Sequence, residues 1–178
     1  MNQFLDTGFV VEDALVFSRW QGFDDEFNEI PQIRLNGEIG CLGRILITVD
    51  KYLNILEGSG DNAVVQTFSY AYNASIQGHG NIFRYDNQDD IFMFNLGHAD
   101  EHHKHLFNWR VADQLGNVIW VGYEGWPKLD QIIREAESWY WENRSELFFP
   151  EQSAQIGKGR FAAFPISDLQ KFPPSLDS

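Results

Sequence analysis

Val64-Val65-Gln66-Thr67-Phe68-Ser69-Tyr70-Ala71-Tyr72-Asn73 is a long run of β-branched and aromatic residues, and it decides the fold class. Such a run is typical of a β-strand. Gln77-Gly78-His79-Gly80-Asn81 has the composition of a turn, and Ile82-Phe83-Arg84-Tyr85-Asp86 has that of a returning strand. Residues 64–86 are therefore predicted to form an antiparallel hairpin.

Upstream of the hairpin, two further strands are predicted. One covers residues 44–50, and the other covers residues 52–57, where apolar and polar residues alternate. The pair Asn36-Gly37 is a turn signal directly after the segment 33–35.

Downstream, the apolar residues 91–94 are predicted to pack or to form a short edge strand, and residues 114–117 read as a turn. Pro127 suits a first helical turn, and a helix is predicted from Pro127 to Arg144. Its apolar face repeats at intervals of three and four residues and consists of Leu129, Ile132, Ile133, Ala136, Trp139 and Tyr140.

Several strands followed by one amphipathic helix favour an α+β fold, with the helix packed on one face of an antiparallel sheet. The 178 residues fit a single domain. Within it we expect an N-terminal extension over 1–43, a sheet-plus-helix core over 44–144, and an extended aromatic and proline-containing tail over 145–178.

The overall charge restricts the partners. The formal net charge is −13, and no Lys/Arg-rich run is present, so broad electrostatic binding to nucleic acid or to an anionic membrane is disfavoured. Cys41 is the single cysteine, which excludes an internal disulfide and a cysteine-based zinc site. We see no signal peptide and no membrane span, so we expect a cytoplasmic protein.

One short stretch concentrates titratable groups. Four of the five histidines lie between His98 and His105, in Gly97-His98-Ala99-Asp100-Glu101-His102-His103-Lys104-His105. If residues 102–106 are extended, His103 and His105 share one face, and His102 and Lys104 share the other. This stretch is the main candidate site.

The motifs Phe68-Ser69-Tyr70, Arg84-Tyr85-Asp86-Asn87 and His102-His103-Lys104-His105, with a helix near Leu129 after them, resemble the TumE-like family of bacterial toxin-antitoxin proteins. The resemblance covers about residues 44–143. Glu101 departs from the family pattern, which has a proline before the paired histidines. The resemblance implies a toxin that acts on RNA and that is bound by an antitoxin protein.

Three functional interpretations remain open. In the first, the protein cleaves RNA without a metal: His103 and His105 exchange protons, Arg84 stabilises the phosphorane charge, and Asp86 orients an imidazole. Histidines suit both proton-transfer roles because their unperturbed pKa is about 6.5. The substrate-binding candidates are Tyr70, Tyr85, Lys104 and His102, with the tyrosines stacking on bases.

The second interpretation is a site for Zn²⁺ or another divalent metal at His98, His103 and His105, with Asp86 or Asp100 able to complete the coordination. The third is a non-enzymatic module that binds a cognate protein and needs no cofactor. The alternative to any functional site is that the histidine stretch is a solvated loop and that Arg84 and Asp86 form an ordinary surface ion pair.

Overall fold

The computed structural model divides the chain into two compact units, Met1–Glu146 and Leu147–Ser178. The residues that it describes are 8–23, 26–58, 63–87, 102–111, 114–122 and 125–147. The described strands and helices all belong to the first unit. The apolar segment 91–94 and the tail beyond residue 147 lie outside the described residues, so their predictions stay untested.

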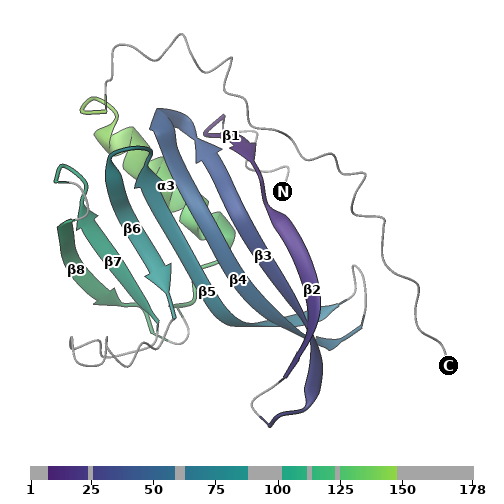
Figure 1. Cartoon of the computed structure of the whole chain (residues 1–178). Coiled ribbons are helices and arrows are strands. Elements are labelled where there is room, and N and C mark those ends of the chain that lie inside the picture. The colour runs from purple at the N-terminus through teal and green to yellow at the C-terminus, as the bar shows by residue number, and fades with distance from the viewer. Residues whose placement is uncertain are drawn as a thin grey trace. The chain divides into compact units, whose positions relative to one another are not determined.

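The described residues form one antiparallel sheet with the strand order β1-β3-β4-β5-β6-β7-β8, and β2 also pairs with β3 (Figure 1). The strands are β1 (Val10–Asp13), β2 (Val16–Phe23), β3 (Glu29–Cys41), β4 (Ile45–Glu57), β5 (Val64–Ile76), β6 (Gly80–Asp86), β7 (His103–Asn108) and β8 (Gln114–Trp120). A 3₁₀ turn, η1 (Leu42–Arg44), joins β3 to β4.

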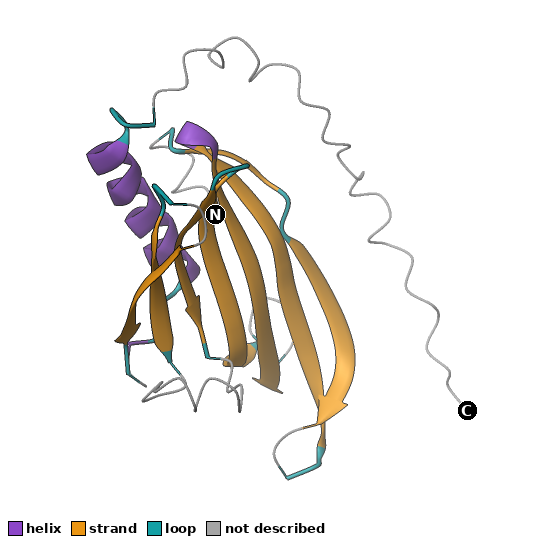
Figure 2. Cartoon of the chain, turned by 60° about the vertical axis from the view of Figure 1, so that its left-hand side comes forward, coloured by secondary structure: helices purple, strands orange, loops and turns teal. Residues whose placement is uncertain are grey.

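The α-helix of the described residues, α3 (Leu129–Asn143), comes after the strands and lies against one face of the sheet (Figure 2). The side chain of Gln131 caps its N-terminus, because Gln131 Oε1 accepts a hydrogen bond from the Lys128 backbone N–H at 2.7 Å. Ile132, Ile133 and Ala136 are buried on its inner face. The predicted antiparallel sheet with one covering helix is confirmed.

The core is made of apolar rows that run across the strands. Ile39, Ile47, Ala74 and Phe83 are successive cross-strand partners on β3, β4, β5 and β6, and each is at most 2% exposed. Complete burial of an isoleucine or phenylalanine side chain contributes about 1.5–3 kcal/mol. This row fixes the register of the central strands, because a slip by one residue would turn it to the other face.

The predicted hairpin is confirmed, since β5 and β6 pair antiparallel across residues 71–86. Two details of the sequence interpretation are wrong. Residues 45–57 form the single strand β4, and residues 114–117 belong to strand β8. A Cβ added at Gly116 would lie 3.1 Å from the Leu106 carbonyl oxygen, at the irregularity in the β7–β8 pairing. This glycine permits a close backbone approach within a strand.

The expected turn at Asn36-Gly37 is also wrong, because both residues lie within β3. Gly37 has φ +144°, and a Cβ there would meet the Ala14 carbonyl oxygen at 2.2 Å. The connection between β1 and β2 crosses at this point, where the Ala14 N–H donates to the Glu38 carbonyl oxygen at 2.8 Å. The glycine therefore makes room for a neighbouring backbone.

Within the described ranges, no helix has the length and apolar character needed to cross a membrane.

Candidate functional site

The pairing of β6 with β7 assembles the candidate site. Asp86 lies opposite His103, and Arg84 lies opposite His105. Successive side chains of a strand point to opposite faces, so these four side chains share one face of the sheet. Tyr85, between Arg84 and Asp86, points to the other face and donates a hydrogen bond to Glu135 of α3 at 2.7 Å. The site is thus on the face that α3 does not cover.

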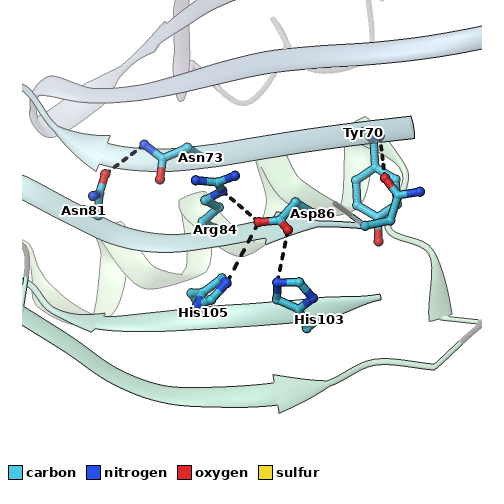
Figure 3. Close-up of polar contacts among 8 residues, drawn as sticks. Tyr70, Asn73, Asn81, Arg84, Asp86, His103 and His105 are labelled. Atoms are coloured by element: carbon cyan, nitrogen blue, oxygen red, sulfur yellow. Dashed lines mark hydrogen bonds and ion pairs between the residues drawn. The ribbon is translucent and has the colours of Figure 1, made fainter. Parts of the chain in front are cut away.

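The carboxylate of Asp86 is the centre of the site (Figure 3). His103 Nε2 lies 3.0 Å from Asp86 Oδ1, His105 Nε2 lies 4.0 Å from Oδ2, and Arg84 Nε lies 2.7 Å from Oδ2. The two imidazole rings stand edge to face with their centroids 4.7 Å apart. Both rings therefore direct a nitrogen toward the same carboxylate.

The four side chains differ in their exposure to solvent. The side chains of Asp86, His103 and His105 are 3%, 4% and 7% exposed, whereas the Arg84 side chain is 42% exposed. Among the described residues, the buried oxygen Oδ2 of Asp86 has no hydrogen-bond donor, and Arg84 contacts it as an ion pair. A carboxylate oxygen in this position has remaining capacity to bind a cation.

Two opposed effects set the ionisation of Asp86. Burial alone would raise the pKa of its carboxyl, but the hydrogen bond from His103 and the nearby charges of Arg84, His103 and His105 hold this pKa below its ordinary value. Asp86 is therefore an anion at neutral pH, as a metal ligand or an imidazole-orienting group must be.

Asp86, His103 and His105 have the donor set and spacing of a three-residue metal site. One ligand atom from each lies within 4.8 Å of the others. Ligand atoms at about 2.1 Å from one zinc ion are about 3.4 Å apart in a tetrahedral arrangement. The His103 contact of 3.0 Å is to Oδ1 and is shorter than this separation, whereas the His105 contact of 4.0 Å is to Oδ2 and is longer. His98 and Asp100, also considered from the sequence, lie outside the described residues.

The four substrate-binding candidates do not lie at the Asp86 cluster. Tyr85 and Lys104 both contact Glu135 of α3. The Tyr70 hydroxyl lies 3.3 Å from His102 Nδ1, and their rings stack. Tyr70, His102 and Tyr85 are at most 9% exposed. The structure therefore places these four residues in packing and polar contacts on the side of α3.

Three residues around the site make contacts that the sequence did not predict. Asn87 accepts a hydrogen bond from the Tyr70 N–H at 2.8 Å and donates one to the Phe68 carbonyl oxygen at 2.9 Å, so it fastens the end of β6 to β5. Glu135 joins α3 to Tyr85. Trp126 packs 4.5 Å from the His102 ring. Of these, only Asn87 had a signal, because it is part of the Arg-Tyr-Asp-Asn motif.

Comparisons of the chain with family models, with curated proteins and with solved structures gave no match. The resemblance to the TumE-like family thus rests on the short motifs alone and stays a prediction.

Proposed function

We propose that this protein binds one divalent transition-metal ion through Asp86, His103 and His105. The observation that carries the proposal is the convergence of three buried ligand atoms within 4.8 Å of one another. Two imidazole nitrogens and one carboxylate suit Zn²⁺, Mn²⁺, Fe²⁺ or Co²⁺.

Among the described residues three protein ligands converge, and these three alone would leave a coordination position for water or a small ligand. This is the arrangement of catalytic rather than structural zinc sites. A metal in such a site lowers the pKa of its bound water or polarises an oxygen of a bound molecule. The proposed function is therefore metal binding of the kind that supports hydrolytic chemistry.

Zinc titration in a competition assay tests this proposal. We expect the metal-free protein to bind one zinc ion per chain. We expect Asp86→Asn and His105→Gln to weaken zinc binding on the order of 100-fold, because loss of a residue that only hydrogen-bonds to a metal ligand already weakens metal affinity about 10–100-fold. His79→Gln is the matched control, because His79 is an exposed histidine on the β5–β6 turn. A zinc affinity unchanged in both Asp86→Asn and His105→Gln would contradict the proposal.

A second candidate is metal-independent cleavage of RNA, the activity implied by the family resemblance. The contact of 3.0 Å between His103 and the ionised Asp86 supports it, because a carboxylate orients an imidazole for proton transfer. The low exposure of both histidines weighs against it, because they would have to touch the substrate.

A chelator separates the two candidates. RNA cleavage that persists in EDTA and is lost in His103→Ala would favour the metal-independent ribonuclease. Growth arrest on expression, relieved by a co-expressed antitoxin, would support the toxin assignment. If purified protein leaves RNA intact with and without EDTA, this second candidate fails while metal binding is unaffected.

A further inference from the structure

Arg84 has an unusual position beside the proposed metal ligands. Its Nε lies 2.7 Å from Asp86 Oδ2, yet its side chain is 42% exposed while that of Asp86 is almost fully buried. The Arg84 side chain is thus partly open to solvent while it contacts the buried carboxylate, and its guanidinium lies between Asp86 and Asn73 in the view of Figure 3. A metal bound at Asp86 and an anion bound at Arg84 would be neighbours.

The neighbours of Arg84 across β5 and β4 carry no negative charge. Its neighbour across β5 is Asn73, whose Nδ2 donates a hydrogen bond to Asn81 at 2.8 Å. These two side chains are neutral, so they do not repel negative charge. Beyond Asn73, the next cross-strand partner is Thr48, which is also neutral. Arginine presents a planar fork of N–H donors that matches the oxygens of phosphate and carboxylate.

Charge selects between these two anions. In the metal-free protein, the positive charge of Arg84 neutralises the negative charge of Asp86. A divalent ion held by Asp86 and two neutral imidazoles brings the sum of metal, carboxylate and guanidinium to about +2, because the ion's own charge is then the largest in the site. A phosphate dianion neutralises this sum, whereas a single carboxylate leaves it positive. A coordination position left by the three described ligands would take one phosphate oxygen, and the guanidinium would donate hydrogen bonds to the others.

We infer that the metal-loaded protein binds a phosphate group between the metal ion and Arg84. This inference rests on the proposed metal site and names its ligand class. It gives Arg84 a binding role toward an oxyanion. It also makes phosphate binding dependent on the metal. Without the ion, the carboxylate of Asp86 pairs with the Arg84 guanidinium, and its negative charge repels the phosphate.

Arg84→Gln has two opposed expected effects. The positive charge that competes with the metal at Asp86 is removed, so metal affinity stays equal or rises. The donors for the anion are lost as well, so phosphate affinity falls on the order of tenfold or more. A merely structural role for Arg84 would weaken both affinities together. Arg84→Lys keeps the charge but not the fork, and we expect it to give an intermediate phosphate affinity.

The experiment uses the full chain loaded with Co²⁺, whose visible absorption reports a change of ligand. Inorganic phosphate and acetate are titrated into the wild type and the two Arg84 variants, and the wild type is also titrated by calorimetry in its metal-free form. Arg34→Gln is the matched control, because Arg34 pairs with Asp50 at 2.7 Å and is 40% exposed, but it belongs to a different ion pair.

We expect phosphate to change the Co²⁺ spectrum of the wild type and of Arg34→Gln at concentrations at least about tenfold below those needed for Arg84→Gln or for acetate. Co²⁺ binding without a phosphate response, or equal responses in wild type and Arg84→Gln, would overturn the inference and leave the metal site standing. Absence of Co²⁺ binding would overturn both. Equal phosphate affinity in the metal-free wild type would overturn the metal dependence.

Discussion

Stability linked to metal binding gives a quantitative test of the role of His105. Its Nε2 lies 4.0 Å from Asp86 Oδ2 and completes the set of three ligand atoms. A metal that binds only the folded state raises the free energy of unfolding by about 2.7 kcal/mol when its free concentration is 100 times the dissociation constant. The wild type is expected to gain this amount.

In His105→Gln, the affinity is expected to fall about 100-fold or more, because one of three protein ligands is lost. At the same free zinc concentration, the metal is then only at its dissociation constant, and the gain shrinks to about 0.4 kcal/mol. Each protein is compared with and without zinc, so any change in packing caused by the substitution cancels. The expected difference is therefore about 2.3 kcal/mol between two proteins that differ in one side chain.

The assay is urea denaturation monitored by tryptophan fluorescence, at fixed free zinc set by a buffer, with a chelator in the reference samples. His79→Gln serves as the control and should keep the full gain, because His79 is exposed on the β5–β6 turn. A gain in His105→Gln equal to that of the wild type would refute the reasoning. The reasoning would also be refuted if zinc did not raise the free energy of unfolding of the wild type at any concentration below that at which the protein aggregates.

Three other residues allow separate tests of the fold and of the site. Gly37→Ala should lower the free energy of unfolding by about 1–3 kcal/mol, since φ at this position is +144° and the added Cβ meets the Ala14 carbonyl oxygen; urea denaturation measures it. Burial, aided by the charge of Glu137, raises the pKa of the Cys41 thiol to about 12, so a thiol reagent at pH 8 should react with it only after denaturation; rapid reaction of the native protein would contradict this. Because the pKa of Asp86 is lowered on folding, its contribution to the metal-free protein should be complete above pH 3.8 and disappear as pH falls through the lower folded-state pKa; Asp86→Asn should lack this acid-dependent loss in denaturation at pH 2–6.

The sequence was sufficient where local pattern decides the structure. The β5–β6 hairpin has a β-branched strand and a glycine-containing turn, and α3 has an apolar face with helical spacing. Both were predicted with nearly correct bounds. Glycine misled the interpretation at Gly37 and Gly116, which read as turn residues but lie in strands, because there the glycine permits backbone approach.

For the site, strand alternation predicted that His103 and His105 share a face, and the structure confirms this. That Asp86 lies opposite His103 depends on the register of β6 with β7, which no short segment contains. Which face α3 covers was equally beyond a local pattern. Strand alternation alone, however, puts His102 and Lys104 on the face opposite His103 and His105, and Tyr85 on the face opposite Asp86. The structure accordingly shows Tyr70, Tyr85, Lys104 and His102 in contacts away from the Asp86 cluster.

Anomalous diffraction from crystals of the zinc-loaded protein tests the central claim most directly. The account predicts one strong peak at the zinc absorption edge, within bonding distance of Asp86, His103 and His105, and no such peak in Asp86→Asn crystals grown in the same zinc concentration. A peak bound only by other residues, or no peak in the wild type, would contradict it.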